Sequence, residues 1–334
     1  MVRAVREFGS VAAALGAGAI LDAAHGPVVL RGAVAHWPAV AQACVSPEAI
    51  CHYLLACGGG KDGAQPVDAL LLPAGERGRL FYGPGMDGFN YARRRLPIAA
   101  VIEQLVRYSQ FAEPPSVAVQ SALVEDCLPD FGRANRLADA LCGAFPGLAG
   151  AAARIWIGNA IVTPAHFDES DNLACVVAGR RRFTLFPPEQ VGNLYIGPLE
   201  YAPTPTPISM VDFSAPDLER FPRFARAMEA ALVADLGPGD AIFIPPLWWH
   251  HVQSSAPLSI LVNYWWRAAA QAPGPQHTPM QAMIAAMDAL RSLPPAQRQA
   301  WGALFAHYVF DAGTDPAAHI PADRQGVLAG VRPA

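Results

Sequence analysis

Thr163-Pro-Ala-His-Phe-Asp168 is the stretch on which the fold and chemistry of this chain depend, together with a distant segment, Trp248-Trp-His-His251. His166 and Asp168 are two residues apart, so on an extended strand their side chains point to the same face. A histidine from the second segment would complete a set of two imidazoles and one carboxylate. Such a set leaves positions open on a metal and suits non-haem Fe(II), although Zn²⁺ accepts the same ligands. The pattern therefore predicts a metal site and leaves the metal undecided.

The sequence around these segments reads as short strands separated by glycine and proline. After the first segment, a strand-like run from Leu173 to Val177 leads to Phe183-Thr-Leu-Phe-Pro-Pro188. Farther on, Leu236-Gly-Pro-Gly-Asp-Ala-Ile-Phe-Ile-Pro-Pro246 has the pattern of a turn and a strand that stops just before the second segment. The N-terminal half is expected to contain a helical lead-in over residues 1–25, a strand at Gly78–Tyr82 and a helix over Pro129–Phe145. Farther on, strands are expected at 172–177, 182–186 and 241–244, and their short spacing is typical of a jelly-roll barrel. This spacing gives weight to the His-x-Asp pair, because most isolated pairs of this kind are ordinary residues of half-buried strands.

These motifs resemble the cupin-like branch of the JmjC oxygenases, which depend on Fe(II) and 2-oxoglutarate, and within it the asparaginyl hydroxylase that inhibits hypoxia-inducible factor. Val28-Val-Leu-Arg-Gly-Ala-Val-Ala-His-Trp-Pro38 looks like the first strand and loop of the family, and Val211 to Phe224 looks like an insert of that hydroxylase. The resemblance implies an α+β fold whose double-stranded β-helix (jelly-roll) core spans about residues 117–267, after N-terminal α/β elements. It divides the chain into an oxygenase domain, residues 1–275, and a C-terminal helical segment, residues 276–334.

The resemblance also implies which residues hold the metal. His166, Asp168 and His250 match the three ligands of the family, and His250 is preferred to His251 because the family ligand directly follows the paired tryptophans. The metal is then Fe(II), and 2-oxoglutarate and O₂ are the cosubstrates of a dioxygenase that hydroxylates a C–H bond. A side chain of a protein or peptide is the favoured substrate.

Four further residues match cosubstrate-binding positions of the family: Thr163, Asn172, Arg181 and Asn263. Arg181 stands two residues after Gly179, where the related hydroxylase has a lysine that binds the far carboxylate of 2-oxoglutarate. Arginine keeps the positive charge and offers two parallel donors to a carboxylate, so we expect it to have the same role. The alternative is that Arg180 to Arg182 form a solvated turn.

The resemblance fails at one cosubstrate position. The family has a tyrosine that reaches the far carboxylate, and our alignment places Ala118 there. Gln120 and Trp265 match positions near the mouth of the metal site, with a structural role for Trp265 as the alternative. The missing tyrosine favours a second hypothesis, a metal-binding cupin-like scaffold that has lost turnover. An oxygenase that acts on RNA or on a small molecule is a third hypothesis.

Composition sets limits on partners and location. The 334 residues are 52% hydrophobic and 16% charged, with a formal net charge of −4, so nucleic acid is not favoured as a partner. Six cysteines without a C-x-x-C pair indicate free thiols in a reducing compartment. No apolar run has the form of a signal peptide or of a spanning helix, so we expect a cytoplasmic protein without membrane contact. Lys61 is the only lysine, which suggests the coding bias of a GC-rich bacterial genome.

Apolar residues recur at helical spacing near the C-terminus, on both sides of a break at Leu293-Pro-Pro295: Met280, Met283, Ile284 and Met287 before it, and Trp301, Leu304, Phe305 and Tyr308 after it. Such a face packs either against the barrel or against a second chain. The resemblance implies the second arrangement, a homodimer.

Overall fold

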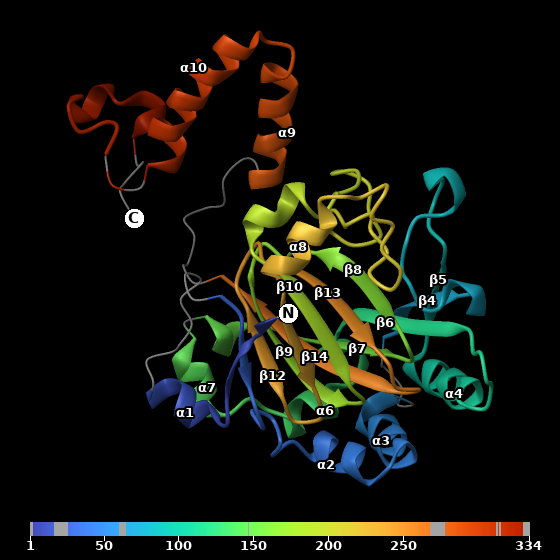
Figure 1. The fold of residues 1–334 in the computed structure, drawn as a ribbon. Helices are drawn as coiled ribbons and strands as arrows, with labels where there is room; N and C mark the ends of the chain where they lie inside the picture. The colour runs from blue at the N-terminus through green and yellow to red at the C-terminus, as the bar shows by residue number, and fades with distance from the viewer. Residues whose placement is uncertain are drawn as a thin grey trace. The chain divides into compact units, whose positions relative to one another are not determined.

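Two β-sheets form the centre of the fold (Figure 1). This computed structural model describes residues 3–16, 26–59, 65–145, 147–267, 278–311, 313 and 315–329. They belong to two units, residues 1–270 and residues 271–334. The predicted domain boundary at residue 275 lies outside the described residues.

The helices of the first unit are α1 (Val11–Gly16), α2 (Pro38–Val45), α3 (Pro47–Leu54), α4 (Ile98–Tyr108), α5 (Val124–Cys127), α6 (Pro129–Ala134), α7 (Asp139–Ala144) and α8 (Phe224–Ala230). Its strands are β1 (Arg3–Ala4), β2 (Arg6–Phe8), β3 (Val28–Leu30), β4 (Val67–Leu72), β5 (Ala92–Leu96), β6 (Ser116–Leu123), β7 (Ala153–Gly158), β8 (Val162–His166), β9 (Asp171–Ala178), β10 (Arg181–Phe186), β11 (Leu232–Leu236), β12 (Ala241–Ile244), β13 (Trp249–Ser254) and β14 (Ser259–Trp266). The second unit contains α9 (Pro279–Leu290) and α10 (Pro295–Phe305). None of the helices in the described part of the chain combines the length and the apolar character that crossing a bilayer requires.

The jelly roll consists of β7 to β14, which alternate between the two sheets along the chain except at β10 and β11, which are neighbours in the same sheet. β8, β10, β11 and β13 lie in the five-stranded sheet, of order β1-β11-β10-β13-β8. β7, β9, β12 and β14 lie in the nine-stranded sheet, of order β2-β3-β12-β9-β14-β7-β6-β4-β5. The named strands pair antiparallel, except that β1 with β11 and β2 with β3 are parallel. The predicted α+β fold with a double-stranded β-helix core is confirmed.

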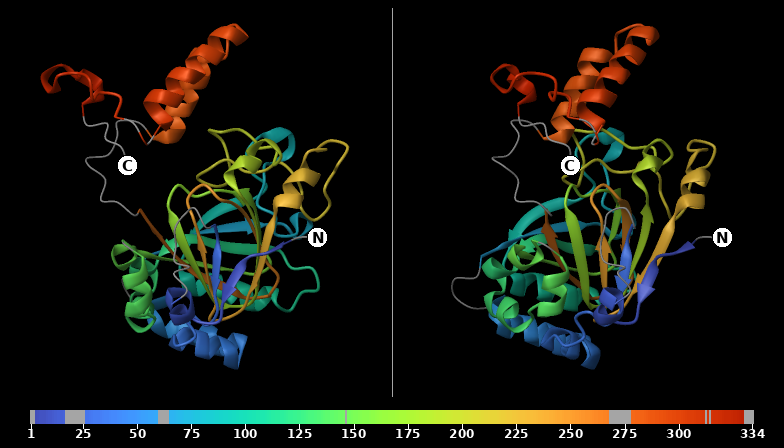
Figure 2. Two further views of the ribbon diagram at one scale, coloured as in Figure 1. Left: turned by 60° about the vertical axis from the view of Figure 1, so that its left-hand side comes forward. Right: turned by 90° about the vertical axis from the view of Figure 1, so that its left-hand side faces the viewer.

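The middle of β9 shows why the run Leu173–Val177 is continuously apolar. Its even-numbered side chains point between the sheets, where they pack in one cluster with Phe183 and Ile242. Its odd-numbered side chains belong to a second cluster, which includes residues of α2, α3, α4 and α6. Figure 2 shows these helices, blue and green, gathered on one side of the sheets. Both faces of the strand are therefore covered, which removes the usual alternation of polar and apolar residues.

Two expectations for the N-terminal half are wrong in part. Residues 1–25 were expected to be helical, but the described part begins with β1 and β2, which extend the edges of both sheets, and only α1 is helical. Residues 17–25 lie outside the described residues. The strand expected at Gly78–Tyr82 forms only isolated bridges, because Gly78 has a left-handed φ of +72° that an extended strand does not have.

The helix expected over Pro129–Phe145 is two helices, α6 and α7, because the chain turns at Asn135. The buried side chain of Asn135 accepts a hydrogen bond from the Ala39 backbone N–H at 2.9 Å and donates to the Tyr53 hydroxyl at 2.9 Å. These contacts tie α6 to the start of α2, and the polar side chain finds better partners there than it would find inside a helix.

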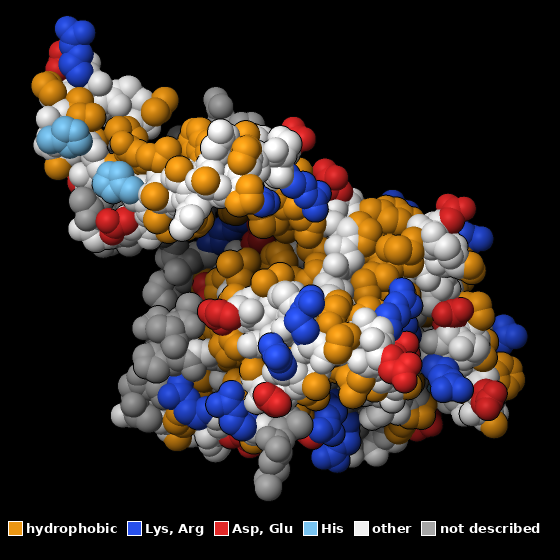
Figure 3. Space-filling model, turned by 45° about the horizontal axis from the view of Figure 1, so that its top comes forward, with side chains coloured by type: hydrophobic (Ala, Val, Ile, Leu, Met, Phe, Trp, Pro, Cys, Tyr) orange, Lys and Arg blue, Asp and Glu red, His pale blue; other side chains and the backbone are white. Residues whose placement is uncertain are grey.

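The second unit presents apolar side chains on its surface. Neither α9 nor α10 has a buried residue. The exposed fractions of Met283, Met287, Trp301 and Leu304 are 44%, 39%, 45% and 46%. Figure 3 shows hydrophobic side chains spread over these helices, at the upper left of the view. The dimer interface predicted for this segment stays a prediction.

Candidate metal centre

The two distant segments meet because β8 and β13 are neighbours. His250 is the register partner of His166, and the centroids of their rings are 4.3 Å apart. Asp168 follows β8, and its Oδ2 lies 3.7 Å from Nε2 of His250. One possible ligand atom from each residue lies within 4.8 Å of the other two, which is close enough for a single metal ion to bind all three. The structure thus brings together the three residues predicted as ligands.

Backbone carbonyls fix the orientation of both imidazoles. Nδ1 of His166 lies 2.9 Å from the carbonyl oxygen of Pro164, and Nδ1 of His250 lies 2.9 Å from that of Trp248. A carbonyl only accepts hydrogen bonds, so each Nδ1 carries the proton and each Nε2 keeps its lone pair. Metal-binding histidines are held in this way in many proteins.

Burial keeps the imidazole of His166 in the neutral, metal-binding form. His250 is only 3% exposed. Burial, and next the proximity of His250, lower the pKa of His166 to about 4. At neutral pH the ring of His166 is therefore uncharged and available as a ligand.

Two side chains from the nine-stranded sheet hold the carboxylate. Asn172 donates from Nδ2 to Oδ2 of Asp168 at 3.0 Å, and Trp265 donates from Nε1 to the same oxygen at 2.9 Å. Nδ2 of Asn263 in turn lies 3.5 Å from Oδ1 of Asn172, and Oδ1 of Asn263 accepts a hydrogen bond from Nε1 of Trp156 at 2.9 Å. Trp265 was predicted near the mouth of the site, and the contact gives it a specific partner.

The carboxylate contact of Trp265 predicts an effect on metal affinity. We expect Trp265→Phe to weaken Fe(II) binding by roughly 10–100-fold, because partners of this kind orient a metal ligand. Competition with a chromogenic chelator measures the affinity. Trp266→Phe is the matched control, since Trp266 packs on Phe145 and Phe243, away from the metal site. Equal iron affinity in both variants would contradict a role for the Trp265 hydrogen bond.

A cavity of about 80 Å³ adjoins the three candidate ligands. The predicted cosubstrate residues Thr163, Asn172, Arg181 and Asn263 all line it, as do Gln120 and Trp265. Seven further lining residues were not predicted from the sequence, among them Trp156, Thr204 and Pro205. The only signal for the last two was the run of prolines in Pro198–Pro207, because nothing local shows that this segment folds back over the metal site.

Arg181 points into this cavity, and its neighbours in β10 show why. The strand alternates, so Phe183 and Leu185 share the inner face with Arg181, whereas Arg182 and Thr184 lie on the outer face. The Nε atom of Arg181 is buried without a hydrogen-bond partner in the described part of the chain, and burial lowers the pKa of Arg181 to about 10. The guanidinium is still charged at neutral pH, and an anion in the cavity would compensate the cost of burying it.

The position expected to hold the family tyrosine is apolar. Ala118 is 4% exposed and packs in a cluster with Leu70, Leu72 and Leu80. Gln120 lines the metal cavity. The register of β6 shifts between Val119 and Ala122, and Ser121 has a φ of +53°. The strand is therefore irregular beside Gln120, and the alternation of side chains does not continue past it.

Comparison with known proteins gives one family and several relatives. The model of the cupin-like domain family matches residues 21–272. The chain is 30% identical over 269 residues to the human bifunctional peptidase and (3S)-lysyl hydroxylase JMJD7, an alignment that covers 72% of this chain and 77% of that protein. It is 34% identical over 167 residues to Jumonji C domain-containing protein 5 of Drosophila melanogaster, covering 49% of this chain and 37% of that protein.

A third relative is human HSPB1-associated protein 1, which is 39% identical over 123 residues, or 36% of this chain. The aligned part is 25% of that protein, so the chain spans about a quarter of its length.

Proposed function

The chain belongs to the cupin-like domain family, and from that premise we propose that it is an Fe(II)- and 2-oxoglutarate-dependent dioxygenase that hydroxylates a C–H bond. The predicted resemblance to the JmjC and cupin-like group is confirmed, and the likeness to the asparaginyl hydroxylase stays a prediction. One observation carries the proposal. A single cavity contains the convergent His166, Asp168 and His250 set and the guanidinium of Arg181.

The donor set fits the groups that this function needs. His166, Asp168 and His250 would hold Fe(II), and Arg181 would bind the far carboxylate of 2-oxoglutarate, with Thr163 beside it. Asn172 and Asn263 would bind the near carboxylate or a water molecule. When bound, iron with 2-oxoglutarate and O₂ supplies the oxidation of a C–H bond.

The residues of the chain position and shield these groups. The carbonyl contacts of the two imidazoles keep the Nε2 lone pairs aimed at the metal, and the bonds from Asn172 and Trp265 keep the Asp168 carboxylate in place. Phe183, Val252 and Leu261 line the cavity, and these apolar side chains exclude water from the space beside the metal.

For the substrate we propose a protein or peptide side chain. One relative is named for lysyl hydroxylase and peptidase activity and another for association with HSPB1. In this proposal a substrate side chain reaches the cavity that the candidate ligands line, and the rest of the substrate stays outside it. Gln120 and Trp265 would then be the residues that the entering side chain meets.

We also propose that the protein is bacterial and cytoplasmic, because it has a single lysine and six cysteines without a C-x-x-C pair.

The test is release of succinate. The purified chain, loaded with Fe(II) under air, should convert 2-oxoglutarate to succinate, and Asp168→Ala should abolish the conversion. Iron binding without any succinate would favour the scaffold hypothesis, which the apolar surroundings of Ala118 support. RNA that copurifies with the chain and stimulates turnover would favour a nucleic-acid substrate.

We further propose that the chain is a homodimer joined through α9 and α10. Full-length protein should scatter light as a dimer at micromolar concentration, because Trp301 and Leu304 leave an apolar face exposed on one chain. The double variant Trp301→Glu with Leu304→Glu should be a monomer, since a buried charge opposes association. A monomeric parent chain would refute the proposal.

A further inference from the structure

A second cavity, of about 660 Å³, lies on the outer face of the five-stranded sheet. Strands β10 and β13 form its floor, and segments Gly75–Phe81 and Asp212–Met228 contribute its walls. His250 points toward the metal site and the next residue, His251, lines this cavity, because successive side chains of a strand face opposite ways. One sheet thus separates two different sites.

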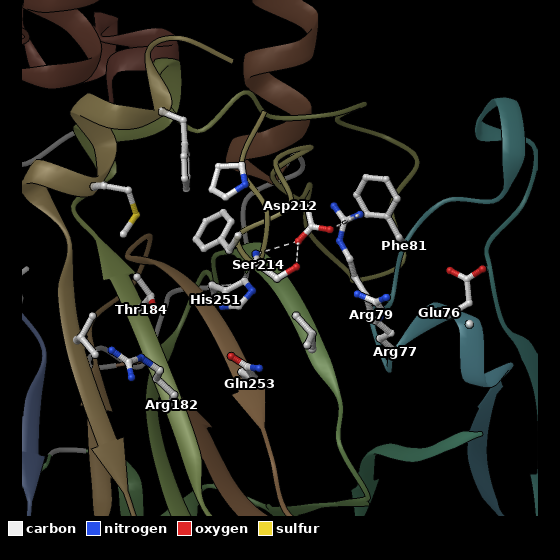
Figure 4. A pocket seen from close by; sticks show the side chains of 17 residues that line it. Glu76, Arg77, Arg79, Phe81, Arg182, Thr184, Asp212, Ser214, His251 and Gln253 are labelled. Atoms are coloured by element: carbon white, nitrogen blue, oxygen red, sulfur yellow. Dashed lines mark hydrogen bonds and ion pairs between the residues drawn. The ribbon is translucent and has the colours of Figure 1, made fainter. Parts of the chain in front are cut away.

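Two buried polar side chains on the floor have no hydrogen-bond partner among the described residues. Thr184 is 7% exposed and His251 is 8% exposed, and the two are register partners on neighbouring strands. The His251 ring stacks on Phe213 at 4.4 Å between centroids, with 7° between the planes. Figure 4 shows both side chains at the cavity, with Arg79 on its other side. Neither side chain is engaged in a hydrogen bond with the described residues, so both are available to a ligand.

The lining of the cavity contains more guanidinium groups than carboxylates, and one of these guanidinium groups, Arg182, has an ion-pair partner outside the lining, Asp235 at 3.6 Å. The lining contains three guanidinium groups and two carboxylates: Arg77, Arg79, Arg182, Glu76 and Asp212. Both carboxylates have close partners within the protein. Glu76 accepts from Asn90 at 2.5 Å, and Asp212 accepts from the backbone N–H and the hydroxyl of Ser214 at 2.9 and 2.7 Å.

Arg79 is the one guanidinium group of this lining that is not exposed, and its donors have no close partner among the described residues. It lies 3.9 Å from Asp212 and 3.4 Å from the Val211 carbonyl oxygen, both long for a hydrogen bond to a guanidinium. Its guanidinium carbon is 3.7 Å from the centre of the Phe81 ring, so one face is covered by an aromatic group. The side chain is 23% exposed. A guanidinium that is held in place and lacks a close carboxylate partner is suited to bind an anion.

The opposite wall is apolar. Phe213, Phe224, Met228 and Val233 line it, and the rings of Phe213 and Phe224 are 4.8 Å apart. The cavity therefore combines an apolar wall, a polar floor and a cation, which is the usual composition of a small-molecule site.

We propose that this outer cavity binds a small organic carboxylate, with its anionic group on Arg79, its polar contacts to Thr184 and His251, and its apolar body against Phe213 and Phe224. The site is separate from the proposed oxygenase chemistry, because the sheet lies between them. No residue of the proposed 2-oxoglutarate site lines it.

Naphthylacetate and its neutral amide test the proposal, because they share an apolar body and differ in charge. Calorimetric titration of the metal-free full chain should give one saturable site for naphthylacetate, with an affinity at least tenfold higher than for naphthylacetamide. Arg79→Gln should lower the affinity for naphthylacetate by about tenfold and leave the affinity for naphthylacetamide nearly unchanged, because only the anion pairs with the guanidinium. Phe213→Leu should lower the affinity for both compounds by a similar factor, because both place the same apolar body against this wall.

Arg94→Gln is the matched control, because it removes the same charge from an exposed side chain of β5 that does not line the cavity. Thermal melting shows whether each variant is folded. If Arg79→Gln does not fold, the affinities of Phe213→Leu for the two compounds test the proposal instead. Equal affinity of the parent for the acid and the amide would overturn the proposal. So would identical effects of Arg79→Gln and Arg94→Gln, or unchanged affinities in Phe213→Leu.

Discussion

His250→Ala should lose iron and succinate release together, whereas the neighbouring change His251→Ala should keep iron. His250 lies opposite His166 and belongs to the set whose ligand atoms fall within 4.8 Å of one another. Removing one of three protein ligands leaves a pair that holds Fe(II) poorly. His251 instead stacks on Phe213 on the outer face of the sheet. Its loss should reduce the free energy of unfolding by about 0.5–1.5 kcal/mol, the contribution of an aromatic pair.

Metal analysis of the two variants, purified and loaded in parallel, measures this difference. The parent should contain close to one iron per chain, His251→Ala the same, and His250→Ala very little. Circular dichroism should show that both variants are folded. Iron retained by His250→Ala and lost by His251→Ala would reverse the assignment of the ligand.

The sequence predicted the jelly roll because its strands are short, apolar and separated by glycine and proline. The strands expected at 172–177, 182–186 and 241–244 appear as β9, β10 and β12 with bounds within one residue. The side-chain alternation of β10 also indicated that Arg181 faces opposite to Arg182, and the structure places the two on opposite faces. Local patterns suffice here because each strand has a buried inner face.

Alternation could not decide between His250 and His251. The two prolines at Pro245-Pro246 are followed by Leu247, which has a left-handed φ of +64°. The chain turns there, so the order of inward and outward residues in β12 does not carry over to β13. Pairing with β8 fixes which histidine points inward, and that pairing joins residues more than 80 positions apart in the sequence. Only the family resemblance supplied this information before the structure did.

Contacts between distant segments explain what the sequence did not reveal. Thr204 and Pro205 reach the metal cavity because the hydroxyl of Thr206 donates to the Phe167 carbonyl at 2.6 Å, which ties the proline-rich segment to the residues between two ligands. Nothing in residues 198–207 encodes that destination locally. The outer cavity is of the same kind, since Arg79, Thr184 and His251 come from three separate parts of the sequence.

Arg181→Met should raise the dissociation constant for 2-oxoglutarate tenfold or more and leave the affinity for iron nearly unchanged. A charge-assisted hydrogen bond is worth about 1.5–3 kcal/mol, and about 1.4 kcal/mol is a factor of ten in binding. Titration of 2-oxoglutarate into the anaerobic Fe(II) protein, followed by visible absorbance of the chelate, measures binding without turnover. Arg182→Met is the matched control, because Arg182 is exposed on the other face of the same strand. Arg181→Lys restores the residue expected from the family and should recover part of the affinity.

The same variant should be more stable than the parent when no ligand is present. In the parent the Arg181 Nε is buried without a partner among the described residues, and burial lowers the pKa of the guanidinium to about 10, so burying this charge costs the free protein stability. Methionine fills similar space without that charge, so thermal melting of Arg181→Met should occur at or above the parent temperature. Adding 2-oxoglutarate should raise the melting temperature of the iron-loaded parent but not that of Arg181→Met, because stabilisation by a ligand grows with the ratio of its concentration to its dissociation constant. If 2-oxoglutarate stabilised both proteins equally, Arg181 would not be its anchor, and the buried guanidinium would need another anion.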